Sequence, residues 1–136
     1  MSQLARASAT NILGYRVEIR AGKHILTADE PVTNRGEDTG PSPYGLLLSG
    51  LGACTAITLR MYAERKGWPL GDVGVQLVLT VDGDEQRISR VLSLAGALDD
   101  DQRARLLDIS ERTPVTKTLK SGVRIHTRLE EMPSPE

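Results

Sequence analysis

The feature that most constrains the fold is a long uncharged stretch in the middle of the chain, residues 39–59. Just inside it, Ser42 is a typical N-cap residue, and Pro43 suits the first position of a helix. Downstream, a basic turn is followed by Gly67, a residue type that commonly closes helices. Together these signals predict one helix over residues 43–66.

The predicted helix is apolar on every side as far as Leu59, which predicts that it is buried on every side. Its strongly apolar part begins only at Leu46, and this length is too short to span a bilayer, so we expect a buried helix. At about 100° per residue, one narrow sector holds only small residues, namely Gly45, Ser49, Gly52, Ala53 and Ala56. Such a face lets a second helix approach closely. We therefore predict a dimer with this helix near the interface; the alternative is a central helix in a monomer.

Hydrophobic periodicity outside this helix predicts several strands and two shorter helices. Apolar and polar residues alternate, or a turn pairs two runs, in segments 15–20, 23–28, 73–81, 86–94 and 123–129. Asp99 can cap a helix at about 100–111. Thr113-Pro114 opens a third helix that ends near Gly122. This order predicts an α+β fold with a mainly antiparallel sheet.

The chain shows no internal repeat and no low-complexity linker, so residues 1–136 are predicted to form a single domain. Residues 29–43 are rich in turn formers and predict a long loop, a kind of segment that is often functional. Residues 1–13 show no clear pattern and, with residues 131–136, are expected to be flexible.

Composition excludes several classes of protein. A formal net charge of -1 argues against electrostatic binding of nucleic acid. One cysteine cannot form an internal disulfide or a cysteine-rich zinc site, and His24 and His126 alone are too few for a metal site. The N-terminus lacks the apolar segment of a signal peptide. We expect a cytoplasmic protein that does not associate with membranes and has no metal or cofactor.

Cys54 is the one nucleophile candidate that the chain offers. A free cysteine is more often a small buried residue without reactivity. Reactivity would require a nearby cation, and either Arg20 or Arg35 could supply it. On the same side of the helix, Leu47, Leu51 and Met61 could line an apolar pocket beside the thiol.

Two motifs resemble those of one known family. "GEDTGPSPYGLLLSGLGACTAITLRMYAERKGWPL" (36–70) closely resembles the core motif of the OsmC/Ohr family, the osmotically induced and organic hydroperoxide resistance proteins. "ERTPVTKTL" (111–119) is similar to the second motif of that family, in which a cysteine precedes the proline. The resemblance implies an OsmC-like fold and an intertwined homodimer whose two long helices pack together.

The same resemblance implies reduction of organic hydroperoxides by a cysteine thiolate. Cys54 matches the peroxidatic cysteine, and Arg20 lies near the position of the activating arginine. Thr113 stands at the resolving-cysteine position, and Tyr44, or Gly45 if the register shifts by one, stands at the glutamate position, so two of the four catalytic groups are absent. The first hypothesis is therefore a one-cysteine peroxidase that acts on small hydrophobic peroxides with an external thiol reductant. The alternative is a non-catalytic homodimer that binds a small hydrophobic ligand.

Overall fold

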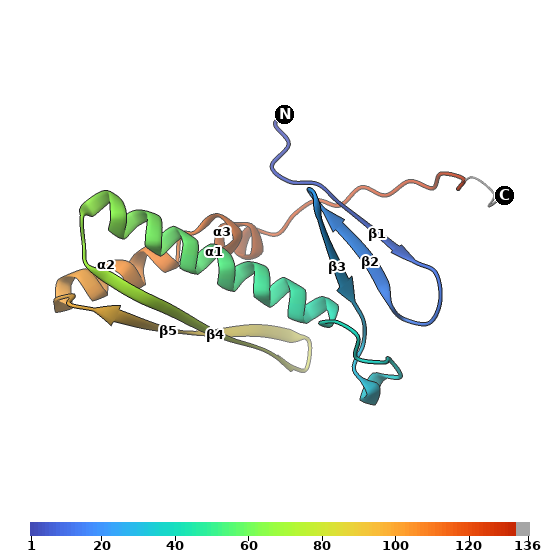
Figure 1. Ribbon diagram of the computed structural model, residues 1–136, viewed down its shortest axis with the longest axis horizontal. Helices are drawn as coiled ribbons and strands as arrows, with labels where there is room; N and C mark the ends of the chain where they lie inside the picture. Colours follow the sequence, from blue (N-terminus) through green and yellow to red (C-terminus); the bar gives the residue numbers. More distant parts are fainter. Residues whose placement is uncertain (133–136) are drawn as a thin grey trace.

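The chain folds into a long central helix and two separate antiparallel sheets (Figure 1). The computed structural model describes residues 1–132, so most of the C-terminal segment predicted to be flexible lies outside the described residues. The first sheet has the order β1 (Ala7–Asn11), β2 (Val17–Ala21) and β3 (His24–Ala28). The second sheet is a hairpin of β4 (Leu70–Asp82) and β5 (Glu85–Gly96). The α+β class is confirmed, but the single chain forms two sheets where one was predicted.

The helices begin and end where the local capping signals predicted. They are α1 (Pro43–Lys66), α2 (Asp100–Ser110) and α3 (Pro114–Ser121), with a short 3-10 helix, η1 (Val32–Asn34), in the long loop. The Ser42 hydroxyl accepts a hydrogen bond from the Gly45 amide at 3.1 Å. Gly67 closes α1 with a φ of 69°, a conformation that favours glycine. Asp99 and Gln102 form the predicted capping box of α2.

The sequence pattern predicted no strand within residues 1–13, which is wrong for β1, whereas the expected flexibility stays a prediction. All five residues of this strand are exposed, and the strand pairs with β2 in antiparallel register. Backbone hydrogen bonds to β2 hold it in place, and these leave no hydrophobic pattern in the sequence.

The predicted strand at 123–129 is also wrong for the single chain. Residues 122–132 have no regular secondary structure, and Val123, Ile125 and Leu129 are 65%, 85% and 98% exposed. The alternation in this segment suits a strand, but a strand forms only where a neighbour accepts its backbone hydrogen bonds. Within residues 1–132, no strand provides that pairing.

The hydrophobic core lies where the C-terminal half of α1 meets β4 and α2. Leu59, Ala63, Leu70 and Leu106 are buried together. Tyr62 and Trp68 close one side of this cluster, with their ring centroids 5.5 Å apart in an edge-on arrangement. Burial of these side chains is the main source of stability in this part of the chain.

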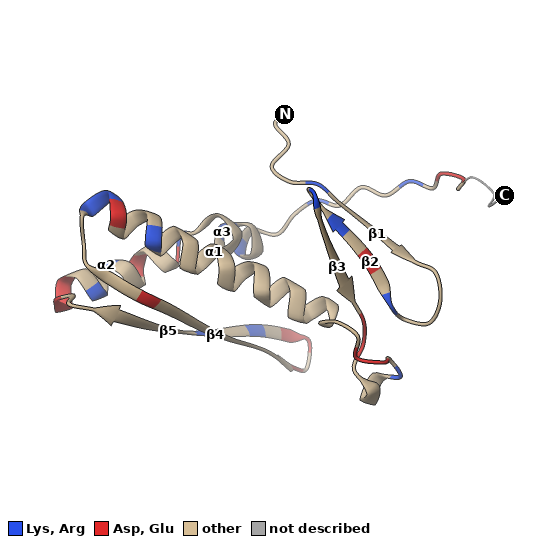
Figure 2. Cartoon of the chain, in the orientation of Figure 1, with Lys and Arg blue, Asp and Glu red and all other residues tan. Residues whose placement is uncertain are grey.

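A single chain buries α1 on one side only, and the predicted burial on every side depends on a second subunit, which the single chain does not test. The buried residues of α1 are Leu51, Thr55, Leu59 and Ala63, which recur every four positions and form one narrow stripe. Ile57 and Met61 are 59% and 57% exposed. By length and composition α1 could cross a membrane, but the core helix of a soluble protein meets the same criterion. Figure 2 shows charged residues only toward its C-terminal end.

Strand β4 of the same chain approaches the small-residue face of α1 at Gly52, and the predicted approach of a second helix is not tested by a single chain. A Cβ atom added at Gly52 would stand 2.9 Å from Cδ1 of Leu77 on β4. Ser49, Ala53 and Ala56 line a hollow whose other side is formed by β4. The close approach that small residues permit is therefore used, at least in part, by the chain's own sheet.

Candidate functional site

Cys54 lies midway along α1, and its side chain is partly buried. Its Sγ is 3.9 Å from the Oγ1 of Thr58, one helical turn further on. The next residue, Thr55, is fully buried. The thiol is therefore next to the buried stripe of α1 but is not sealed inside it.

The cations considered for Cys54 lie elsewhere in the chain. The Nε of Arg20 pairs with the carboxylate of Glu18 at 3.3 Å, and both side chains are more than half exposed. Strand β2, which carries them, lies beyond the N-terminal end of α1 (Figure 1). Arg35 follows η1 and lines a small hollow with Tyr15 and other residues of the loop. A single chain does not bring Arg20 to the middle of α1.

Thr113, at the resolving-cysteine position, is fully buried. It occupies the N-cap position of α3, but its side chain makes no capping hydrogen bond. Its Oγ1 lies 2.7 Å from the Oγ1 of Thr116. The hydroxyl thus belongs to an internal hydrogen-bond network, and the simple N-cap role expected from the sequence is incomplete.

Arg90 is the centre of that network, and sequence reasoning did not identify it. From β5 its Nη1 donates to the Oγ1 of Thr55 at 3.0 Å and to the Oγ1 of Thr116 at 2.9 Å. Its Nη2 donates to the carbonyl oxygen of Ser110 at 2.9 Å. The Arg90 side chain, 11% exposed, therefore joins β5 to α1, α2 and α3, and it contacts α1 at Thr55, the residue after Cys54.

A signal for Arg90 was present in the sequence. Along β5 the half-buried positions alternate, and Arg90 stands at one of them between Ile88 and Leu92. A charged residue at an inward position of an apolar alternation is rarely buried without partners. Its partners lie 20 to 35 residues away in sequence, so their identity needed the tertiary structure.

Two further charges lie close to Arg90. The Oε2 of Glu111 is 3.9 Å from its Nη2 and 2.8 Å from the Nζ of Lys120. The hydrogen bond from Lys120 holds the pKa of the Glu111 carboxyl below its usual value, so this group is ionised at neutral pH. Two cations and one carboxylate leave one net positive charge at this end of the site.

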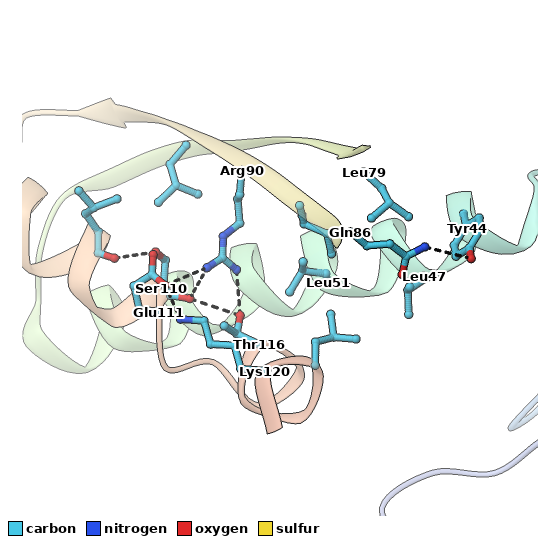
Figure 3. Close-up of a pocket in the computed structure, with 14 residues that line it drawn as sticks. Tyr44, Leu47, Leu51, Leu79, Gln86, Arg90, Ser110, Glu111, Thr116 and Lys120 are labelled. Carbon is cyan, nitrogen blue, oxygen red and sulfur yellow. Dashed lines mark hydrogen bonds and ion pairs between the residues drawn. The ribbon is translucent and has the colours of Figure 1, made fainter. Parts of the chain in front are cut away.

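A cavity of about 500 Å³ opens beside this cluster (Figure 3). Its apolar lining comes from α1, β4, β5, α2 and α3, namely Leu47, Leu51, Leu79, Ile88, Leu92, Leu107 and Leu119. Tyr44 lies at the end away from Arg90, and its hydroxyl accepts a hydrogen bond from Nε2 of Gln86 at 3.4 Å. Amphipathic clefts of this size are typical of small-molecule sites.

Only some of the residues that the sequence predicted for an apolar pocket beside Cys54 line the cavity. Leu47 and Leu51 line the cavity, as does Tyr44. Neither Cys54 nor Met61 is part of its lining. Met61 lies on another side of α1, in a shallow hollow with Ile57 and Arg60. The thiol and the main cavity are neighbours on α1, with Thr55 between Cys54 and the Arg90 network.

Comparison with known proteins identifies the family. Residues 36–128 match the family model described as OsmC-like protein. This match covers more than half of the chain and includes both Cys54 and Thr113. The chain therefore belongs to the OsmC-like family.

Solved structures show the same fold at low sequence identity. An OsmC-like protein from Mycoplasma pneumoniae has a TM-score of 0.77 and 19% identity, with 88% of this chain and 89% of that chain covered. An organic hydroperoxide resistance protein OsmC from Legionella pneumophila has values of 0.66 and 18%, covering 87% and 90%. The organic hydroperoxide resistance protein OhrB of Bacillus subtilis has 0.63 and 20%, covering 87% and 91%. No curated protein sequence matches the chain significantly.

Proposed function

We propose that this chain is a stress-related thiol peroxidase that reduces organic hydroperoxides through Cys54. Membership of the OsmC-like family supports a redox role, and two of the structural neighbours are named for organic hydroperoxide resistance. The observation that carries the proposal is the place of Cys54 within the matched segment, with a thiol that is only partly buried.

In the proposed cycle the Cys54 thiolate attacks the terminal oxygen of a hydroperoxide ROOH. The O–O bond breaks, the alkoxide leaves and takes a proton to become ROH, and Cys54 becomes a sulfenic acid. An external thiol then forms a mixed disulfide with Cys54 and releases water. A second external thiol reduces this disulfide and regenerates the Cys54 thiol, so two external thiols become one disulfide in each turnover.

An external thiol must attack the Cys54 sulfenic acid directly because Thr113 stands at the resolving-cysteine position, and Tyr44 replaces the glutamate that would help to activate the thiol. The Thr113 hydroxyl cannot form a disulfide, and it is already paired with Thr116. Tyr44 carries no carboxylate, and it lies at the first turn of α1, more than half exposed. A sulfenic acid at Cys54 therefore waits for a thiol from solution or oxidises further.

We also propose that the protein acts in the cytoplasm as a homodimer. Exposed apolar side chains support the homodimer: Ile57 and Met61 on α1 are more than half exposed, as is Ile25 on β3. Exposed apolar area of this kind marks interaction surfaces. In addition, residues 123–129 have the alternation of a strand and no strand partner among the described residues. A second copy of the chain would cover the first feature and pair the second.

The experiment that tests the peroxidase proposal compares Cys54→Ser with the wild type. Consumption of cumene hydroperoxide would be followed with dithiothreitol as the reductant. We expect the Cys54→Ser protein to fall to the uncatalysed rate, because no other thiol exists in the chain. The matched control is Ser49→Ala, a change on the same helix that should leave the rate intact. Unchanged consumption by Cys54→Ser would contradict the proposal.

A second candidate function is the binding of a small hydrophobic ligand without turnover. The cavity of about 500 Å³ favours it, because leucine is the most frequent residue in its lining and Cys54 is not part of that lining. Ligand binding there requires no redox chemistry. The two functions are separable, since one depends on Cys54 and the other on the cavity.

A further inference from the structure

We propose that the cavity between α1, β5 and α3 binds an amphipathic monocarboxylate, such as a fatty acid, with its carboxylate held by Arg90. This inference rests on the ligand-binding function proposed above and specifies the chemistry of the ligand. It does not depend on Cys54. Three features of the cavity support it: the charge at one end, the free donors of Arg90, and the apolar path that leads away from Arg90.

The net positive charge at the Arg90 end of the cavity can be balanced by one bound anion. Arg90 is nearly nine-tenths buried, and burying a guanidinium is costly unless an anion accompanies it. The nearest carboxylate, that of Glu111, is 3.9 Å from Nη2 of Arg90 and accepts a closer hydrogen bond, of 2.8 Å, from Nζ of Lys120. The hydrogen-bond partners of Arg90 are two hydroxyls and a carbonyl, all neutral. A single bound carboxylate would balance the one net positive charge.

The geometry of Arg90 suits a carboxylate. A guanidinium has five N–H groups, and the three hydrogen bonds to Thr55, Thr116 and Ser110 use three of them. The remaining two N–H groups of Arg90 have no hydrogen-bond acceptor among residues 1–132, so they can donate to solvent or to a ligand. Because three elements hold the guanidinium in place, little side-chain entropy remains to be lost when an anion binds. Arginine binds carboxylates more strongly than a neutral donor does.

The rest of the cavity suits an acyl chain. Figure 3 shows Leu51, Leu47 and Leu79 between Arg90 and the Tyr44–Gln86 hydrogen bond. The apolar side chains come from both α1 and the β4–β5 hairpin, so a hydrocarbon would be covered on two sides. Each methylene group buried there contributes about 0.8 kcal/mol in transfer free energy. A ligand with a charged head and an apolar tail therefore matches the cavity better than one with either part alone.

The test compares two ligands of equal chain length, dodecanoate and dodecanol, by displacement of a fluorescent acyl probe from the full-length protein. We expect the wild type to bind dodecanoate at least tenfold more tightly than dodecanol. Arg90→Met should remove this preference and leave dodecanol binding within about threefold. The matched control is Arg87→Met on the same strand, whose side chain is 71% exposed and pairs with Glu85. This variant should retain the full preference.

A second variant keeps the inference testable if Arg90→Met does not fold. Leu47→Trp, at a partly exposed position of the cavity lining, should fill the cavity and weaken both ligands at least tenfold. Equal binding of dodecanoate and dodecanol by the wild type would overturn the inference and leave hydrophobic ligand binding intact. Binding of neither ligand would contradict both. The same measurements on Cys54→Ser should be unchanged, which separates this result from the peroxidase proposal.

Discussion

The two ends of this molecule are built differently. The half formed by the end of α1, the β4–β5 hairpin and α2 has its own core, in which Leu59 and Leu106 are fully buried. The other half, the three-stranded sheet, leaves Ile25 and Leu26 of β3 61% and 45% exposed. Both halves carry regular secondary structure, yet only the first contains a cluster of buried apolar side chains, and both leave other apolar side chains exposed. The helices and strands of this chain therefore carry more apolar side chains than a single copy of the chain can bury.

The largest effect on stability is expected in the core formed by the end of α1, the β4–β5 hairpin and α2. Leu106→Ala removes a fully buried side chain, which typically lowers the free energy of unfolding by about 2–5 kcal/mol. The neighbouring Leu107→Ala changes a side chain that is 58% exposed and should cost about 0.5 kcal/mol or less. Urea denaturation of the two variants measures the difference. An equal decrease in the free energy of unfolding for the two variants would contradict the presence of a packed core in this half.

A smaller effect is expected where the chain leaves apolar surface uncovered. Ile57→Glu places a charge on the exposed side of α1, and burial of an unpaired charge in an interface is costly. We expect the dissociation constant of the homodimer to rise at least about tenfold, which corresponds to 1.4 kcal/mol. Sedimentation equilibrium measures this constant, with Asp84→Asn in the β4–β5 turn as a control that changes the charge by the same amount. A wild type that is monomeric at high concentration would contradict the dimer.

The smallest effect is expected at the loop that leads into α1. The Asp29 carboxylate accepts hydrogen bonds from the Thr39 hydroxyl at 2.6 Å and the Thr39 amide at 3.1 Å. The hydroxyl bond is the main reason that the pKa of Asp29 lies below its ordinary value of 3.8. A lowered pKa means that ionised Asp29 stabilises the folded state above the unfolded pKa, and that this contribution is lost as pH falls through the folded value.

Asp29→Asn should therefore lower Tm at pH 7, and its difference from the wild type should shrink progressively as the pH falls below about 4. The control is Asp38→Asn in the same loop, an exposed residue with a φ of 55° that asparagine also tolerates. It should behave like the wild type at both ends of the pH range. A Tm difference for Asp29→Asn that does not change with pH would mean that the charge has no role.

The elements that could be predicted from sequence are those fixed by local chemistry. Helix α1 begins after Ser42 and ends before Gly67 as predicted, because a side-chain cap, a proline and a positive-φ glycine act within a few residues. The same holds for α2, which has its capping box. The β4–β5 hairpin follows from alternation on both sides of a short turn.

The elements that could not be predicted depend on distant partners. β1 has no buried residue, so nothing in its side chains marks it as a strand. Residues 123–129 carry a correct alternation but have no strand beside them in this chain. Arg90 has its partners on three other elements, and the cavity beside it exists only once α1, β5 and α3 pack together. Sequence motifs located Cys54, and the tertiary structure placed it outside that cavity.

The measurement that tests the central claim most directly is the rate at which Cys54 is oxidised by cumene hydroperoxide and by hydrogen peroxide. Intact mass would follow the sulfenic acid trapped with dimedone, across a range of pH. If Cys54 is a peroxidatic residue, its sulfenic acid is trapped rapidly, and faster with cumene hydroperoxide than with hydrogen peroxide. A rate no faster than that of a free cysteine, for which the pKa is about 8.5, would contradict the claim that Cys54 is a peroxidatic residue.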